Sequence, residues 1–326
     1  MRYKRLNYEQ RYSIEKMLKT KTKKKEIALV LGISESTLYR ELNRNKRARG
    51  SYNAIYANML AHERQCEGHY KKKFTSSMEK IVIAKLKEKW SPDQIVGWCR
   101  LNTIDMVSHE RIYQYVWEDK YQGGNLYTHL RTGQKKYRKR YGKQDSRGQI
   151  RDKVSIEKRP AVVEKKKRIG DFEIDLIVGK NHKGAMLTIV DRKTNYTITQ
   201  PLANKSADGV EKALVNALAP YKNITHTITS DNGKEFANHK QVARKLKTNF
   251  YFAHPYASWE RGANENTNKL IRQYLPKNTD LRTVDNQHNL YIMKQLNDRP
   301  RKKLDYKTPK QVFYNDINNQ KLALAN

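Results

Sequence analysis

The order of local patterns after Gly170 constrains the fold of this chain more than any other feature. Three short runs rich in β-branched and aromatic residues come first, at 171–179, 185–194 and 195–203. Turn-forming residues separate these runs, which is typical of consecutive strands. A segment with helical spacing of its apolar residues follows at 206–221. This part of the chain is therefore expected to begin as three strands that lead into a helix.

Strands and helices then alternate, with expected boundaries at 226–233, 240–247, 249–255 and 263–275. Three strands followed by helix, strand, helix, strand and helix is the order of a ribonuclease-H-like domain. We therefore predict an α/β domain with a mixed five-stranded sheet and flanking helices at 169–285. A C-terminal helical segment is expected to follow at 286–326.

Three acidic residues stand at positions that this order of elements would bring together. Asp175 lies in the first expected strand, Asp231 at the end of the fourth, and Glu265 in the first turn of the late helix. The first and fourth strands of such a sheet are neighbours, and the late helix packs across their ends. The three carboxylates are therefore expected to converge.

Each acid also has an ordinary interpretation. Asp171 and Glu173 lie on the same strand face as Asp175, so alternation alone does not choose among the three, although we favour Asp175. Asp231 begins an Asp-Asn-Gly cluster that is common in turns. Glu265 fits a plain acid near a helix N-terminus. The order and spacing of the three together, rather than any one of them, point to a site.

Converging carboxylates have a defined chemistry. They repel one another and take up protons unless cations neutralise them. Hard oxygen ligands suit Mg²⁺, with Mn²⁺ as a substitute. Two such ions about 4 Å apart can activate an attacking oxygen and stabilise a leaving one at a phosphodiester. Asp175, Asp231 and Glu265 are thus predicted to be catalytic residues that hold two ions.

The late helix also carries basic residues on the face of its acid. Lys269 and Arg272 follow Glu265 at i+4 and i+7, and we predict that both contact a DNA backbone. The alternative is an i,i+4 Glu–Lys pair on a solvated helix. Tyr256 and Trp259 precede the helix and are expected either to stack on an unpaired base or to pack the loop.

The first third of the chain has the pattern of a helix-turn-helix at residues 1–50. Gly32 is suited to end one short helix, and Ser34 is a natural N-cap for the next. Leu38 and Leu42 then repeat at i, i+4 and are expected to face inward. Two short helices joined in this way offer the second one to the major groove.

Four residues on the opposite face of the second helix are predicted to contact DNA, namely Ser36, Tyr39, Arg40 and Arg44. Small hydroxyls near a helix start and arginines one turn later suit base edges and phosphates. The alternative is a plain helical hairpin with a solvated polar face.

A weaker copy of this pattern follows in the region 51–133. Residues 107–113 align with 33–39 at their apolar, Ser and Tyr positions, and Ser91-Pro92 is a good helix start. A second helix-turn-helix is therefore predicted, although a purely structural hairpin has the same pattern. Residues 134–168 then hold 15 Lys or Arg against 4 Asp or Glu. We predict a basic linker that lies along DNA, or else a solvated spacer.

Charge and cysteine content narrow the class of protein. Lys plus Arg outnumber Asp plus Glu by 67 to 33, for a net charge of +34. Such an excess calls for a polyanion, most often nucleic acid, although ribosome binding or unspecific adhesion to acids also fits. Cys66 and Cys99 are too few for a disulfide scaffold or a zinc finger. Without a signal peptide or a membrane span, a cytoplasmic protein that binds no membrane is expected.

Several segments together span nearly the whole chain and carry a family resemblance: IALVLGISESTLYRELNRN, WSPDQI, VSHERIYQYVW, RIGDFEIDLIVG, LTIVDRKTNYT, SDNGKEF, PYASWERGANENTNKLIRQYLPK and LNDRPRKKLDYKTPKQVF. With them the chain resembles the insertion-sequence-thirty group of bacterial DDE transposases. Two departures stand out: Phe172, where the family more often has Trp, and Glu260, where it often has Gln. Glu260 leaves open which glutamate binds metal, although Glu265 keeps the expected spacing.

The resemblance implies a ribonuclease-H-like catalytic domain with a DDE triad at Asp175, Asp231 and Glu265 and a dependence on Mg²⁺. It also implies double-stranded DNA partners, namely terminal inverted repeats and target DNA, and a homo-oligomer acting on paired ends. The function predicted from the sequence is therefore DNA transposition. A non-catalytic repressor and a structure-specific nuclease of the same fold are the alternatives.

Overall fold

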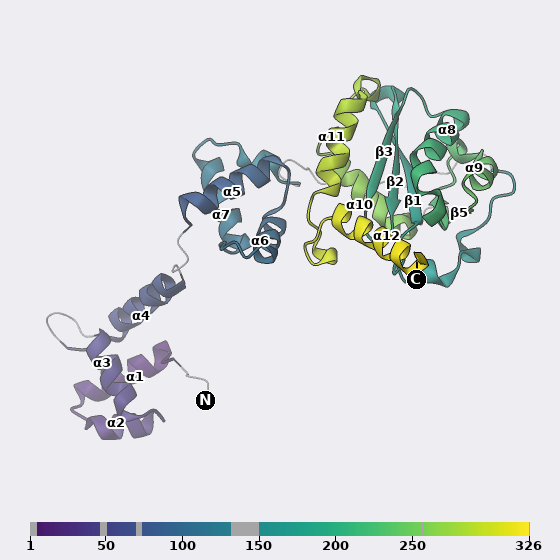
Figure 1. The fold of residues 1–326 in the computed structure, drawn as a ribbon. Coiled ribbons are helices and arrows are strands. Elements are labelled where there is room, and N and C mark those ends of the chain that lie inside the picture. The colour runs from purple at the N-terminus through teal and green to yellow at the C-terminus, as the bar shows by residue number, and fades with distance from the viewer. Residues whose placement is uncertain (1–4, 46–50, 70–73, 132–149, 256, 326) are drawn as a thin grey trace. The chain divides into compact units, whose positions relative to one another are not determined.

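The computed structural model describes residues 5–45, 51–69, 74–131, 150–255 and 257–325 (Figure 1). Contacts along the chain divide it into two compact units, Met1–Phe74 and Thr75–Asn326, and each is described below by itself. Among the described residues, no helix is both long and apolar enough to cross a membrane.

The first unit is a small helical domain. Its helices are α1 (Tyr8–Lys19), α2 (Lys24–Val30), α3 (Glu35–Asn45) and α4 (Ala54–His69). The fully buried side chains of Ile14, Ile27 and Leu38 form its centre. Gly32 adopts a φ of +61° between α2 and α3, and the Ser34 hydroxyl accepts a hydrogen bond from the backbone N–H of Thr37 at 3.3 Å. Helices α2 and α3 therefore have the geometry of the expected helix-turn-helix.

Helix α4 extends this unit beyond the expected boundary at residue 50. The Glu15 carboxylate accepts a hydrogen bond from the backbone N–H of Ala54 at 2.7 Å, and the Arg11 guanidinium donates one to Asn58 at 3.0 Å. Tyr52 and Ala57 are buried in the same core as α1. The first domain therefore extends beyond the predicted boundary at residue 50. The sequence did not show this, because α4 attaches through small apolar residues and buried polar contacts rather than through a strong apolar stripe.

The second unit begins with three helices that form the next helical region. They are α5 (Ser76–Lys87), α6 (Pro92–Leu101) and α7 (His109–Tyr121). Ser91 caps α6 in a capping box with Gln94, and Ser108 caps α7 in the way that Ser34 begins α3. Val82, Leu86, Ile95, Ile112 and Val116 are completely buried. The expected helix starts are therefore correct, and contact with DNA stays a prediction for this region.

Residues 150–168, the part of the predicted basic linker that the structure describes, pack against the rest of the protein and are not a solvated spacer. Ile156 and Val163 are buried, Ile150 packs in the main core of the sheet domain, and Ser155 forms a β-bridge with Phe252. The apolar residues that anchor 150–168 are few and stand among many lysines and arginines, so the sequence pattern did not indicate that this segment packs against the sheet. Residues 134–149 lie outside the described part of the chain.

The sheet has five strands in the order β3-β2-β1-β4-β5. Their bounds are β1 (Asp171–Val178), β2 (Ala185–Asp191), β3 (Thr197–Leu202), β4 (Thr227–Ser230) and β5 (Asn249–Phe252). Strands β1, β2 and β3 pair antiparallel, whereas β4 pairs parallel with both β1 and β5. This is the mixed five-stranded sheet that the sequence predicted.

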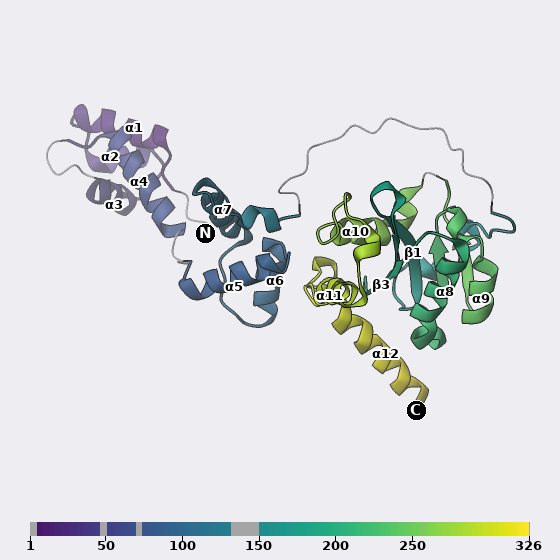
Figure 2. The same cartoon turned by 90° about the horizontal axis from the view of Figure 1, so that it is seen from above.

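Helices cover both faces of this sheet (Figures 1 and 2). Helices α8 (Ala207–Leu218) and α9 (His239–Leu246) lie on one side, and α10 (Gly262–Ile271) and α11 (Asn286–Asn297) on the other. Phe172, Ile174 and Ile228 lie in the larger of two cores, with α8 and α9. Ile177, Met186 and the apolar residues of α10 and α11 form the other.

The expected C-terminal segment is helical but belongs to the sheet domain. Asn289 and Asn297 of α11 lie along the free edge of β3, and their side chains hydrogen bond to the backbone of Thr199 and Thr197. These side-chain amides bond to backbone N–H and C=O groups on the edge strand β3, which would otherwise be open to pairing with another chain. Phe313 of α12 (Pro309–Ala325) stacks on Tyr196 with ring centres 4.3 Å apart.

Candidate active site

Asp171 is the first of three acidic residues on one face of β1, and its surroundings make it structural. Its carboxylate is only 1% exposed and forms a two-point ion pair with Arg168, at 2.8 and 2.9 Å. It also accepts a hydrogen bond from the Thr227 hydroxyl at 2.8 Å. With its oxygens engaged by protein donors, Asp171 is not placed to hold a ligand.

Glu173 anchors the helix that carries Glu265. One oxygen of its carboxylate accepts hydrogen bonds from the backbone N–H groups of Ala263 and Asn264, each at 3.1 Å. The other oxygen lies 3.2 Å from the Arg192 guanidinium, and the side chain is 1% exposed. An anion at a helix N-terminus satisfies free N–H groups and matches the helix dipole. Glu173 therefore ties α10 to the centre of the sheet.

Asp175 is the acid on this face that stays open to solvent. Strands β1 and β4 pair in parallel from Asp171–Thr227 to Glu173–Thr229, and Asp175 and Asp231 each lie two residues beyond the last of these pairs. Their side chains are 24% and 28% exposed. Asp231 follows the last residue of β4 and accepts a hydrogen bond from the Gly233 N–H at 3.0 Å. Two of the three predicted carboxylates thus meet where β4 ends beside the middle of β1.

Arg261 lies between these two carboxylates. Its guanidinium nitrogens are 3.3 Å from Asp175 Oδ1 and 3.4 Å from Asp231 Oδ2. Asn268 of α10 donates a hydrogen bond to Asp175 Oδ2 at 2.7 Å. Burial raises the pKa of Asp175, the Arg261 charge opposes that rise, and the Asp231 charge adds to it. The pair is therefore a site at which ionised carboxylates need a nearby cation.

Glu265 is in the first turn of α10 but is not gathered with the two aspartates. Its carboxylate accepts a hydrogen bond from Lys269 at 2.6 Å and is 42% exposed. Within the described residues, no three His, Cys, Asp or Glu side chains are grouped as a metal site. The expected convergence of three carboxylates is therefore not formed in this structure, and the alternative i,i+4 pair with Lys269 is.

The two basic residues predicted to contact DNA on α10 both have partners within the protein. Lys269 is paired with Glu265 and is half exposed. Arg272 donates a hydrogen bond to the carbonyl of Val178 at 2.9 Å, and burial lowers its pKa. The Trp259 side chain is 76% exposed, which leaves it available for stacking, whereas Tyr256 lies outside the described residues.

Glu260, the second glutamate near the site, is engaged by a histidine. It accepts hydrogen bonds from the backbone N–H of His254 at 2.8 Å and pairs with the imidazole Nδ1 at 2.7 Å. Glu157 lies on the other side of the ring, 3.2 Å from Nε2. Both glutamates are therefore held by protein groups, Glu260 by His254 and Glu265 by Lys269, and these contacts do not decide which of them binds metal.

The His254 pair predicts a pH dependence in the loop before α10. Hydrogen bonding and charge from Glu260, with a smaller contribution from Glu157, raise the pKa of His254 above 6.5. Because the folded-state pKa is raised, the pair stabilises the loop fully below about pH 6.5 and less as the pH rises through the folded pKa. An NMR titration of the His254 ring should give a pKa above 6.5 that falls in Glu260→Gln. Equal pKa values in both proteins would contradict the pairing.

The residues predicted to contact DNA on α3 lie on its solvent face. The Ser36 hydroxyl is 2.9 Å from that of Ser34, and Arg40 donates a hydrogen bond to the Ser36 carbonyl at 3.1 Å. The Tyr39 ring is half exposed beneath the Lys24 ammonium, 4.8 Å from it. Leu38 is fully buried on the opposite side, as expected.

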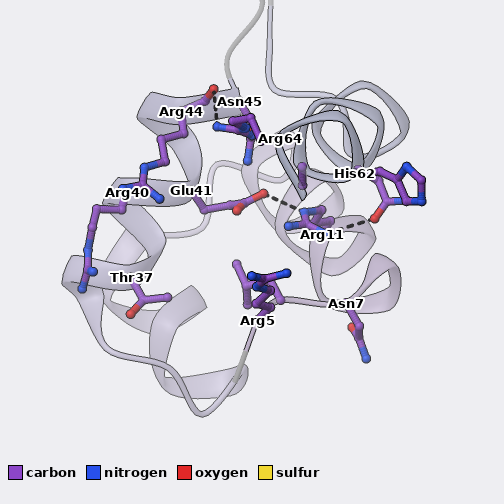
Figure 3. Close-up of a pocket in the computed structure, with 13 residues that line it drawn as sticks. Arg5, Asn7, Arg11, Thr37, Arg40, Glu41, Arg44, Asn45, His62 and Arg64 are labelled. Atoms are coloured by element: carbon purple, nitrogen blue, oxygen red, sulfur yellow. Dashed lines mark hydrogen bonds and ion pairs between the residues drawn. The ribbon is translucent and has the colours of Figure 1, made fainter. Parts of the chain in front are cut away.

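A basic cavity of about 670 Å³ lies beside α3 in the same unit (Figure 3). Its lining includes the charged residues Arg5, Arg11, Arg40, Glu41, Arg44 and Arg64, together with His62. Glu41 neutralises Arg11 at 2.8 Å, whereas Arg64 is bound to Asn45 and to the carbonyl of Arg44. The sequence pattern identified Arg40 and Arg44 only, because the other arginines come from α1, α4 and the N-terminal residues before α1.

Comparison with known proteins places these features in a family. Residues 167–258 match the model of the integrase core domain. The chain is 50% identical to the transposase for insertion sequence element IS4351 of Bacteroides fragilis, over 99% of each protein. It is 34% identical to the transposase InsI for insertion sequence element IS30A of Escherichia coli (strain K12), over 94% of this chain and 83% of that protein.

Among solved structures, the catalytic core domain of BIV integrase is similar to this chain, with a TM-score of 0.37 and 16% sequence identity. The similarity covers 46% of this chain and 97% of that domain. The integrase core match and the mixed sheet indicate a ribonuclease-H-like fold for the second unit. The match includes Asp175 and Asp231 and ends before Glu265. Both of these transposases align with nearly the full length of this chain. The chain therefore belongs to the IS30 family of insertion-sequence transposases.

Proposed function

We propose that this chain is a DDE transposase that binds the terminal inverted repeats of its element and then cleaves and joins DNA strands. The observation that supports this most is the Asp175–Asp231 pair, whose carboxylates share the Arg261 guanidinium at 3.3 and 3.4 Å beside the end of β4. Glu265 would complete the triad from α10, which Glu173 fixes against β1, once it leaves Lys269.

The donor set of the site suits a hard divalent cation. Two partly exposed carboxylates, one within β1 and one just after β4, are oxygen ligands of the kind that Mg²⁺ and Mn²⁺ prefer. Asp175 and Asp231 would hold the metal, and Glu265 would join them after leaving Lys269. When bound, a pair of such ions activates an attacking oxygen and stabilises a leaving one at a phosphodiester.

The protein's own residues position these groups. Asn268 holds one oxygen of Asp175, which leaves the other oxygen turned toward Arg261. Asp231 is fixed by the turn that its own carboxylate closes at Gly233. Lys269, once released from Glu265, would supply a positive charge on the same helix face for a DNA phosphate.

A cleavage assay tests this function. Incubation with a duplex that carries the terminal repeat should give strand cleavage in Mg²⁺ or Mn²⁺ and none in EDTA. Joining of the cleaved end to a second duplex should follow the same dependence on metal. Cleavage of equal efficiency in EDTA would contradict the proposed chemistry.

The helix-turn-helix of the first unit is proposed to recognise the repeat through α3. Arg40→Ala should weaken binding to the repeat by about 1–3 kcal/mol if Arg40 contacts a base. Lys16→Ala is a matched control, because it removes one exposed cation from α1 of the same unit. Fluorescence anisotropy with repeat and scrambled duplexes measures both effects. Unchanged affinity in Arg40→Ala would mean that α3 is not the recognition helix.

A further inference from the structure

Arg168, Arg192 and Arg261 each pair with a carboxylate on the same face of β1, and the first and the last of them do so in different ways. Arg168 binds Asp171 with two short contacts, at 2.8 and 2.9 Å, which is the strong planar geometry of an arginine–carboxylate pair. Arg261 instead divides itself between two carboxylates, with longer contacts of 3.3 and 3.4 Å. The first arrangement is typical of a permanent structural pair, and the second is not.

The rest of the Arg261 guanidinium is also poorly satisfied. Its side chain is 14% exposed, and its buried Nε has no hydrogen-bond partner within the described residues. One of its terminal nitrogens reaches the carbonyl of Ile174 only at 3.4 Å. A buried donor without a partner is unfavourable, so the position of Arg261 is held mainly by the two aspartate charges.

Arg261 therefore occupies the position between Asp175 and Asp231 that charge balance assigns to a cation. We propose that Arg261 is a displaceable counter-ion that neutralises the two catalytic aspartates before metal binds and competes with metal for them. This inference rests on the proposed assignment of Asp175 and Asp231 as metal ligands. It makes Arg261 a positioning residue of the metal-free site, from which it must withdraw as metal enters.

The position of Arg261 in the chain fits this role. It is the N-cap of α10, and the backbone N–H groups that begin this helix are held by Glu173 rather than by Arg261. Displacement of the Arg261 side chain therefore leaves the anchor of α10 in place. Gly262, the next residue, is the first of the helix and would have open space around an added Cβ, so nothing packs tightly against the backbone there.

Calorimetric titration of the full chain with Mn²⁺, in the absence of DNA, tests the proposal. Arg261→Gln should bind Mn²⁺ about 10- to 100-fold more tightly than the wild type, the size expected when charged hydrogen bonds that compete with metal are removed. Arg261→Lys keeps one charge but cannot span both carboxylates, and it should fall between the two. Arg244→Gln removes the same charge from an exposed position in the last turn of α9, without touching either aspartate, and should change affinity less than about threefold.

Two further measurements separate the possible failures. Loss of Mn²⁺ binding in Asp231→Asn shows that the metal site is the one proposed; binding that is unaffected by this change overturns the proposed metal site itself. If Asp231→Asn abolishes binding but Arg261→Gln leaves it unchanged or weaker, the metal site stands and the counter-ion role is wrong. Thermal denaturation without metal shows whether Arg261→Gln is folded, and Arg261→Lys gives the decisive comparison if it is not.

Discussion

Replacing Asp231 with Asn is expected to lower strand cleavage and joining by about a thousandfold or more while leaving affinity for the terminal repeat unchanged. The Asn side chain keeps an oxygen that can accept the hydrogen bond from Gly233, so the turn after β4 should persist. It removes the negative charge that faces Arg261, and with it the ability to hold a divalent cation next to Asp175. The change therefore acts on chemistry rather than on folding.

The assay compares wild type, Asp231→Asn and Asp208→Asn on a duplex with the terminal repeat, in Mg²⁺. Asp208 is an exposed acid in the first turn of α8 and serves as the matched control, with full activity expected. Equal activity of Asp231→Asn and wild type would remove the mechanism and favour a repressor that uses only its helical units. Cleavage that ignores the DNA sequence would instead favour a structure-specific nuclease.

The second large effect is expected on the stability of the protein when Glu173 is replaced. Glu173 lies two residues before Asp175 on the same face of β1. Glu173→Gln should lower the free energy of unfolding of the sheet domain by about 3 kcal/mol, the lower end of the range for breaking a buried ion pair. Among the residues that the structure describes, it leaves the buried Arg192 with the exposed Glu164 as its acidic partner, and it weakens the cap of α10. Asp175→Asn removes a partly buried charge whose pKa is raised chiefly by that burial, so it should cost little stability.

Chemical denaturation monitored by circular dichroism measures both variants. A large loss for Glu173→Gln together with a small change for Asp175→Asn would assign structural and catalytic roles to two acids that alternation alone does not distinguish. A stability of Glu173→Gln equal to that of the wild type would contradict its role as the anchor of α10.

Much of the fold could be predicted because its signals are local. Turn residues separate β1, β2 and β3, and the apolar spacing of α8 is regular, so the order of elements is visible in the sequence. Helix α4 and residues 150–168 could not be placed in the same way. Ala54 and Ala57 are too small to give a strong stripe, and Ile150 is one apolar anchor within a basic run.

The candidate site was predictable only in part. Asp175 and Asp231 follow from strand order, because parallel neighbours bring equivalent positions level. The structural roles of Asp171 and Glu173 depend on Arg168 and on the start of α10, which no spacing along β1 reveals. Arg261 was missed because its effect arises from two carboxylates that are far apart in sequence. Glu265 was predicted to join the aspartates, but its carboxylate is paired with Lys269, one turn along the same helix.

Anomalous diffraction from crystals of the protein with terminal-repeat DNA and Mn²⁺ tests the central claim most directly. The account predicts manganese bound by the carboxylates of Asp175 and Asp231, with Arg261 withdrawn and Glu265 turned from Lys269 to the metal. Manganese bound elsewhere, or bound while Glu265 remains paired with Lys269, would contradict it.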